Sequence, residues 1–243
     1  ISKSGTTIET LTNVFLLKIL KQNSRNIIII SEKKNNFLYK TSKKMNLYFI
    51  EHKHYIGGRY SVLSEVGLVP AFMMGINIIK LRENIINTLK KKNTIFLKNS
   101  SIYISYLLQN KKFKNIIFLN YAPQLENFLF WLQQMVAESL GKDGKGFLPV
   151  VSPAPKDHHS LLQLYLDGPK DKFFYIFSVE KNKNLKVQSR IEDPKLNFLK
   201  NKNLNKIKSS QKDAFIKAIK SKKIPFREFK IHHINEQTIG KLF

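Results

Sequence analysis

The chain has 243 residues, enough for one large domain or two small ones, and carries 42 Lys and Arg against 17 Asp and Glu, a formal net charge of +25. It contains no cysteine, which excludes disulfides, Cys-based metal sites and thiol catalysis and is compatible with a reducing cytosol, so we expect a cytoplasmic protein. The longest apolar runs, such as NIIII at 26–30, are too short to span a bilayer, and we expect no membrane partner.

The basic residues are spread along the whole chain and interleaved with Asn and Ile, as in KNKNLNKIK at 200–208. A basic surplus could indicate a nucleic-acid or membrane-surface partner. Lys, Asn and Ile are also the amino acids of A/T-rich codons, so a bias of the genome explains the surplus without any ligand. The chain has no RGG, zinc-finger or RNP pattern either, and we expect no nucleic-acid partner.

The chain opens with ISKSGTTIET, in which four polar residues surround a glycine directly before a helical pattern: Ser2, Lys3, Ser4 and Thr7. Free backbone amides, hydroxyl groups and a lysine at a helix N-terminus form a cradle for an anion such as phosphate. The same stretch also fits a plain capping box, Thr6-x-x-Glu9, and the two interpretations are compatible. We call residues 2–7 the cradle.

A continuous run of β-branched residues at 26–31 predicts a strand buried on both faces of a parallel sheet. A helix at 36–45 and a strand at 47–52 follow, which is the β-α-β order typical of a doubly wound α/β fold. His52 and His54 form the only H-x-H pair. Because no third ligand is in view, we interpret them as surface residues at a strand end and expect no metal site.

The next segment, IGGRYSVLSEVGLVPAFMMG at 56–75, places Arg59 directly after Gly57 and Gly58. Two glycines allow a sharp turn and the close approach of a ligand. Arg59 could then steady a developing oxyanion, or it could pair with a surface carboxylate such as Glu65. The rest of the segment is rich in Val, Leu, Ala and Met and predicts a buried helix.

The remainder of the chain repeats the alternation of helices and apolar strands, and a second α/β unit would begin near 90–94. Helices are predicted at 94–109, 210–220 and 235–242, and strands at 115–121, 146–151, 173–179 and 226–232. The predicted fold class is therefore α/β.

Between two of these strands lies the sequence from Trp131 to Gly168. It begins as a helix with one apolar face, and Glu138 lies near its end, before Gly141. A proline-containing loop then brings Asp157, His158 and His159 to the start of another helix. A carboxylate at a helix end and an imidazole at a loop–helix junction suit general acid–base catalysis on a small substrate. The plain alternative is an acidic last turn and an N-capping Asp with surface histidines.

Four motifs resemble the glucose-6-phosphate isomerase (phosphoglucose isomerase) family in their order: SKSGTT followed by T-x-E, GGRYSVLSEVGL, QQMVAESLGKDGKG and DHHSLLQ. The resemblance implies two SIS domains, each a three-layer α/β/α sandwich around a doubly wound, mainly parallel sheet. Residues 1–92 would be the C-terminal part of the first domain with connecting helices, and 93–243 the second. The implied activity is reversible isomerisation of glucose 6-phosphate to fructose 6-phosphate through a cis-enediol, with no cofactor and no metal.

The resemblance also implies roles for residues of the first domain. The family's SKSGTT loop grips the phosphate of the sugar, a role matched by Ser2, Lys3, Ser4 and Thr7. Arg59 matches the arginine that stabilises the cis-enediolate.

In the second domain, Glu138 matches the base that moves a proton between C2 and C1, and it would work best if partly buried against the apolar face of its helix. Gln134 lies four residues earlier, on the same face, and matches a glutamine that contacts the sugar. His159 matches a histidine that assists ring opening and reaches the active site of the partner subunit, which implies a homodimer with shared sites. The variable neighbouring position, His158, is given no role.

Two departures from the family pattern matter. A further catalytic Lys, in a motif like D-Q-x-x-V-E-x-x-K, has no match, and Lys241 is not that residue. The N-terminal part of the first domain is also missing. We therefore expect an internal fragment of a larger isomerase that is inactive alone. The alternative is a SIS-type sugar-phosphate sensor, which would keep the cradle but would need neither Glu138 nor His159.

Overall fold

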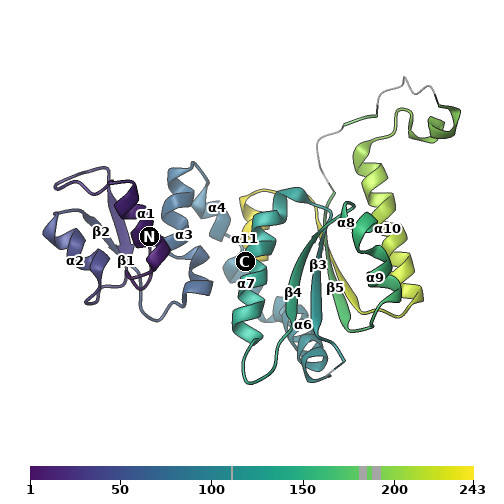
Figure 1. Ribbon diagram of the computed structural model, residues 1–243, viewed down its shortest axis with the longest axis horizontal. Helices are drawn as coiled ribbons and strands as arrows, with labels where there is room; N and C mark the ends of the chain where they lie inside the picture. Colours follow the sequence, from purple (N-terminus) through teal and green to yellow (C-terminus); the bar gives the residue numbers. More distant parts are fainter. Residues whose placement is uncertain (111, 181–184, 188–192) are drawn as a thin grey trace. The chain divides into compact units, whose positions relative to one another are not determined.

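The computed structural model describes every residue except 111, 181–184 and 188–192, and gives the backbone alone for 91–93. The chain forms two compact units, one made of Ile1–Thr88 with Ile239–Phe243 and one made of Leu89–Thr238. Figure 1 draws their helices and strands, and each unit is described by itself. The α/β fold class is confirmed, whereas the assignment of two SIS domains stays a prediction.

The first unit is built on a two-stranded parallel sheet of β1 (Ile28–Ser31) and β2 (Tyr48–Glu51), in which Ile28 pairs with Tyr48. Helix α2 (Phe37–Lys44) connects the two strands, so the predicted β-α-β order is confirmed. Three of the four residues of β1 are buried, as expected of a strand covered on both faces. Its core consists of Ile29, Leu38 and Leu47 with half-buried apolar neighbours.

Short helices complete this unit: α1 (Ile8–Leu16), the 3-10 helix η1 (Gly58–Leu63), α3 (Glu65–Met73), α4 (Ile78–Arg82), α5 (Ile85–Leu89) and α11 (Glu236–Leu242). The C-terminal part of α11 packs tightly on α4, because a Cβ atom at Gly240 would overlap the carbonyl oxygen of Leu81.

The prediction that the segment after Arg59 forms a buried helix is wrong in part. Helix α3 forms there, but Ala71 is its only buried residue, and Phe72 and Met73 are exposed. The apolar composition of a helix indicates that burying it would be favourable, but it does not show which other element buries it.

The second unit contains a four-stranded, fully parallel sheet in the order β4-β3-β5-β6. The strands are β3 (Asn115–Asn120), β4 (Leu148–Pro153), β5 (Lys172–Val179) and β6 (Phe226–Ile231). Each lies within two or three residues of a predicted strand. The apolar runs of β3 and β5 are buried almost throughout, which is the signature of central strands in a parallel sheet.

Helices cover both faces of this sheet and give three layers (Figure 1). They are α6 (Lys91–Gln109), η2 (Pro123–Leu125), α7 (Glu126–Leu140), α8 (Asp157–Ser160), α9 (Leu162–Asp167) and α10 (Leu204–Ser221). The 3-10 helix η3 (Pro194–Leu199) precedes α10 and has no buried residue. On one face, α9 and α10 pack through Tyr165, Phe215 and Ile219 onto Ile117 and Leu119 of β3. On the other, Phe128 of α7 contacts the ring of Phe177 in β5.

Helix α10 begins six residues before the predicted start at 210. The Lys- and Asn-rich sequence hid this start, although Asn203 is its N-cap and accepts a hydrogen bond from the backbone amide of Asn205 at 2.8 Å. Part of the Lys- and Asn-rich segment around 180–206 lies outside the described residues.

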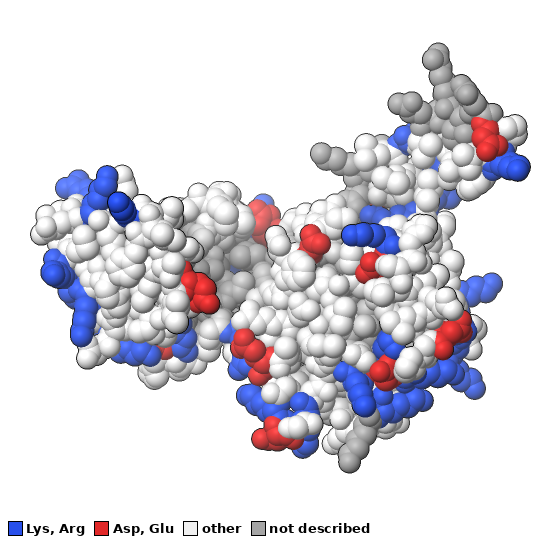
Figure 2. Space-filling model, in the orientation of Figure 1, with Lys and Arg blue, Asp and Glu red and all other residues white. Residues whose placement is uncertain are grey.

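The basic side chains are dispersed. Figure 2 shows Lys and Arg over both units on the visible face, with Asp and Glu among them rather than in a single basic stripe.

Candidate active site

The cradle is a turn in which hydroxyl groups converge. Ser2 is buried, and its Oγ lies 2.8 Å from Oγ1 of Thr7, which in turn lies 3.4 Å from Oγ of Ser4. Thr7, not Thr6, is the N-cap of α1, and no side chain makes a capping hydrogen bond there. The plain capping box is therefore wrong. The hydroxyls of Ser2 and Ser4 also accept hydrogen bonds from the backbone amides of Gly5 and Thr6. Because no hydroxyl caps the helix, the amides at the start of α1 remain available to an anion.

Gly5 sets the shape of the cradle. Its φ is +69°, a left-handed conformation that favours glycine, and a Cβ atom would overlap the side-chain oxygen of Asn36. That oxygen accepts a hydrogen bond from the backbone amide of Tyr39 at 2.9 Å and so caps α2. The Asn36 amide donates to the carbonyl of Glu32 at 2.9 Å. The cradle thus packs directly on the N-terminus of α2.

Lys3 connects the cradle to the turn that carries Arg59. Its Nζ donates to the carbonyl oxygen of Ile56 at 2.6 Å and lies 3.5 Å from the carboxylate of Glu32. Glu32 is largely buried and also contacts Lys34 at 2.5 Å. The hydrogen bond from Lys34, together with the charges of both lysines, holds the pKa of Glu32 below its usual value of 4.5. This carboxylate therefore remains ionised near neutral pH and keeps Lys3 in place.

His52 also binds the carbonyl of Ile56, with Nε2 3.2 Å from the oxygen. It is 1% exposed, so the interpretation of His52 as a surface residue is wrong, whereas His54 is exposed as expected. Nδ1 of His52 lies 3.7 Å from Oε2 of Glu65, and within the described chain neither atom has a hydrogen-bond partner. A local pattern could not reveal this contact because Glu65 belongs to the helix beyond the turn.

Arg59 lies in the 3-10 helix η1, which serine hydroxyl groups fix near its start and at its end. The hydroxyl of Ser61 donates to the carbonyl of Gly58 at 2.7 Å, and that of Ser64 to the carbonyl of Ser61 at 2.7 Å. Gly67 allows α3 to pack against this turn, because a Cβ atom there would overlap the carbonyl of Val62. The side chain of Arg59 is half-buried.

In the second unit, Gln134 and Glu138 lie on one face of α7, as their spacing predicts. Nε2 of Gln134 donates to Oε1 of Glu138 at 2.8 Å. Gly141 ends the helix, as expected. Both side chains are exposed, so in this chain Glu138 is not buried against the apolar face of its helix. Other residues of α7 form its half-buried face. Among them, Gln133 fixes the helix on the sheet by donating to the carbonyl of Pro149 in β4 at 2.8 Å.

Asp157, His158 and His159 form the short helix α8 after β4. Lys156 is the N-cap, so the alternative of an N-capping Asp is wrong. The carboxylate of Asp157 instead accepts hydrogen bonds from the hydroxyls of Ser152 at 2.8 Å and Ser160 at 3.2 Å. These bonds tie α8 to the carboxyl end of β4 and leave His159 exposed.

His158, which the motif comparison left without a role, has the more structured environment. Its Nε2 lies 2.7 Å from the hydroxyl of Tyr121, and its ring stacks on Phe215 with centroids 5.6 Å apart. Burial lowers the pKa of His158 and raises that of Tyr121. No local pattern indicated this pair, because Tyr121 and His158 are 37 residues apart.

Glu138 and His159 lie at opposite edges of the second sheet. Helix α7 starts just after β3 ends and finishes just before β4 begins, so it runs back along the sheet. Glu138 therefore lies at the amino edge, about 18 Å along the helix from its start, and α8 lies at the carboxyl edge. Within one unit these two residues do not meet. The cradle and Arg59 belong to the other unit.

The described residues contain neither a metal-binding cluster nor a membrane-spanning helix. No group of three or more His, Asp or Glu among them is placed to hold a metal ion. No helix in the described part of the chain has both the length and the apolar character needed to cross a membrane.

Solved structures share the fold. A hypothetical protein from Thermus thermophilus superposes with a TM-score of 0.84 at 24% identity and covers 99% of this chain and 61% of its own. A glucose-6-phosphate isomerase from Chlamydia trachomatis gives a TM-score of 0.73 at 15% identity and covers 99% of this chain and 51% of its own. These neighbours place the chain among α/β proteins built on parallel sheets.

The sequence defines the family. The model of the phosphoglucose isomerase family matches residues 1–146, a stretch that includes the cradle, Arg59 and Glu138. The chain belongs to the phosphoglucose isomerase family.

Named relatives cover the whole chain. A probable glucose-6-phosphate isomerase of Methanococcus maripaludis is 35% identical, and the glucose-6-phosphate isomerases of Methanocaldococcus jannaschii and Mycoplasmopsis pulmonis are 34% and 33% identical. The chain spans 56%, 61% and 60% of the lengths of these three relatives.

Proposed function

We propose that the full-length protein containing this chain is a glucose-6-phosphate isomerase that interconverts glucose 6-phosphate and fructose 6-phosphate in the cytosol. The observation that carries the proposal is the family match over residues 1–146, which contain the cradle, the Arg59 turn and the Gln134–Glu138 pair. In this proposal the hydroxyls and amides of the cradle bind the phosphate, and the rest of the sugar lies toward the reacting groups.

The proposed reaction moves one proton between adjacent carbons. The carboxylate of Glu138 takes the proton from C2 of the open-chain aldose and returns it to C1 after the enediol forms. The hydroxyl proton of O2 passes to O1 in the same conversion, so no atoms or electrons enter or leave the substrate. Gln134 holds one carboxylate oxygen at 2.8 Å and fixes its orientation. Arg59 stabilises the negative charge that develops on the substrate oxygens of the cis-enediolate.

We assign ring opening to His159 of a partner subunit. The position of Glu138 and His159 at opposite edges of one sheet supports a site shared between two copies, because one copy alone cannot bring them together within that unit. An imidazole can donate and accept protons near neutral pH, as ring opening requires. The proposed assembly is therefore a homodimer.

Glu138→Gln in the full-length protein tests the role of the base. We expect turnover, measured by coupling glucose 6-phosphate production to its dehydrogenation, to fall by roughly 10²–10⁴-fold while binding of fructose 6-phosphate is kept. The matched control is Glu126→Gln, an exposed carboxylate at the start of the same helix. Unchanged turnover in Glu138→Gln would refute the assignment. Binding without turnover in the unmodified protein would favour a sugar-phosphate sensor.

Mixing two inactive variants tests the shared site. In a dimer of one Glu138→Gln and one His159→Asn subunit, one of the two sites keeps both native groups, so a random mixture should regain about a quarter of full activity. No regain of activity in dimers shown to have exchanged subunits would place both groups in a single copy. We also propose that residues 1–243 alone are inactive without the Lys-bearing helix of the family, and full turnover by that chain would contradict this.

A further inference from the structure

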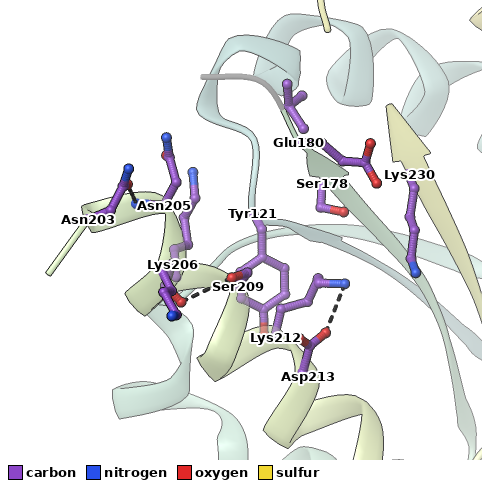
Figure 3. Close-up of a pocket in the computed structure, with 12 residues that line it drawn as sticks. Tyr121, Ser178, Glu180, Asn203, Asn205, Lys206, Ser209, Lys212, Asp213 and Lys230 are labelled. Carbon is purple, nitrogen blue, oxygen red and sulfur yellow. Dashed lines mark hydrogen bonds and ion pairs between the residues drawn. The ribbon is translucent and has the colours of Figure 1, made fainter. Parts of the chain in front are cut away.

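The second unit contains a pocket of about 860 Å³ that the proposed isomerase reaction does not use (Figure 3). Its wall includes Tyr121, directly after β3, and Ser178 and Glu180 at the end of β5. The opposite wall is the first half of α10. The pocket thus lies at the carboxyl edge of the parallel sheet, where open α/β folds bind their ligands, and its volume suits a small molecule.

None of the residues assigned to isomerisation lines the pocket. The cradle and Arg59 belong to the first unit. Glu138 lies at the amino edge of the second sheet, whereas the pocket lies at the carboxyl edge. His159 lies on α8 at the same edge as the pocket, next to His158, which contacts Tyr121 of the wall, but His159 itself does not line the pocket. The wall of the pocket is therefore a separate set of residues from those assigned to isomerisation, and the inference does not rest on the proposed function.

Two carboxylates line the pocket, and both already have cationic partners. Asp213 lies 3.1 Å from Nζ of Lys212. Glu180 lies 3.2 Å from Nδ1 of His232, which pairs with it fully when protonated. Figure 3 shows the ion pair between Lys212 and Asp213 at one end of the pocket. The charge of Asp213 is therefore offset by Lys212, and that of Glu180 is offset when His232 is protonated.

Four lysines line the pocket, and two of them have a carboxylate partner. Lys212 also contacts Glu228, and Lys230 lies 3.6 Å from the same residue. Lys206 and Lys208 have no ion pair or side-chain hydrogen bond with any described residue. Lys206 and Lys208 are therefore the two wall lysines whose charge no carboxylate of the described chain offsets.

Lys208 differs from an ordinary, fully solvated surface lysine. Its side chain is half-buried, and burial lowers the pKa of its ammonium group. A cation held away from water without a counter-ion is destabilised, and a bound anion would remove that cost. The N-terminus of α10, an 18-residue helix, opens beside it through Asn203 and Asn205 and adds a partial positive charge.

We propose that this pocket binds a small molecule bearing a phosphate group, with Lys206 and Lys208 as its charge partners. The hydroxyl of Ser178 supplies a neutral donor, and the start of α10 contributes its partial positive charge, while the backbone amides of Leu204 and Asn205 already donate to Leu185 and Asn203. The buried ring of Tyr121 forms part of the wall against which the rest of the molecule packs.

The test uses pyrophosphate as the probe and the full-length protein, with binding measured by titration calorimetry in the absence of divalent cations. We expect the double variant Lys206→Gln/Lys208→Gln to weaken binding by about tenfold or more, because charged hydrogen bonds are lost. The matched control is Lys217→Gln, an exposed lysine of the same helix outside the pocket, which should change the affinity less than about twofold. Lys208→Arg keeps the charge and should keep the binding.

Pyrophosphate can also enter the cradle, so the same titration is repeated with Thr7→Val. We expect this variant to keep the binding that Lys206→Gln/Lys208→Gln loses. The proposal is overturned if pyrophosphate does not bind at millimolar concentration, or if Thr7→Val alone abolishes binding. It is also overturned if Lys217→Gln weakens binding as much as the pocket variant does. The proposal is overturned as well if a single-stranded decanucleotide binds more tightly than pyrophosphate and Lys217→Gln weakens that binding as much as the pocket variant does. That result would indicate a nucleic-acid-binding surface in place of a small-molecule pocket.

Discussion

Replacing Gly5 with alanine should destabilise the first unit much more than an ordinary glycine substitution. The residue has φ +69°, which costs an alanine about 1 kcal/mol. The new Cβ would overlap the side chain of Asn36. If Asn36 moves away, α2 loses its N-cap, at about 1 kcal/mol, and the carbonyl of Glu32 loses a hydrogen bond, at about 1 kcal/mol more. Together these losses come to about 3 kcal/mol.

Amide hydrogen exchange measured on peptides from β1 and α2 is the suitable assay. The single tryptophan, Trp131, lies in the second unit, so its fluorescence does not report on the first. A loss of about 3 kcal/mol should accelerate exchange in these peptides by roughly a hundredfold. Gly75→Ala is the matched control, because Gly75 also has a positive φ, +81°, but has open space around its Cβ position. It should accelerate exchange by only about fivefold.

A double variant isolates the contact between the cradle and α2. Asn36→Ala removes the overlapping side chain, so adding it to Gly5→Ala should cost almost nothing further, although Asn36→Ala alone costs about 2 kcal/mol. Equal effects of Gly5→Ala and Gly75→Ala, or additive costs in the double variant, would refute the reasoning.

Three further outcomes are expected. Burial lowers the pKa of His158, so the unfolded chain binds a proton more readily than the folded chain. The contribution of neutral His158 to stability is fully present above the ordinary pKa of 6.5 and is lost as the pH falls from there through the lower pKa of the folded state. Urea midpoints at pH 7.5 and 5.5 should therefore differ less in His158→Asn than in the unmodified protein. His52→Ala leaves the carbonyl of Ile56 with one donor fewer and opens a buried space, so urea unfolding should show a loss of about 1–3 kcal/mol, and an unchanged midpoint would contradict the contact. Gly240→Ala forces α11 away from Leu81, and a calorimetric scan should show a melting temperature lower by about 2–4 °C or more; an unchanged value would mean that the two helices do not touch.

The elements and the local parts of the site could be predicted from the sequence because their signals lie within a few residues. The apolar run of β1, the end of α7 at Gly141 and the shared face of Gln134 and Glu138 are of this kind. The spacing of four residues alone places the last two side chains side by side.

The parts that could not be predicted depend on contacts between distant segments. The burial of His52 follows from the packing of α3 beyond the turn, and the lowered pKa of His158 follows from its burial beside Tyr121 and Phe215. Lys3 is assigned to the cradle from its position in the sequence, yet its Nζ donates to a carbonyl 53 residues away. Periodicity and spacing carry no information on such pairs.

The oxygen atom on which Lys3 and His52 converge belongs to the main chain of Ile56. A backbone carbonyl is present whatever the side chain, so residue 56 can change during evolution without breaking the connection between the cradle and the Arg59 turn. The two donors have no such freedom, because each must reach the oxygen with a nitrogen. The coupling of the two loops therefore leaves no mark on the identity of residue 56, and comparing amino acids at that position among relatives would miss it.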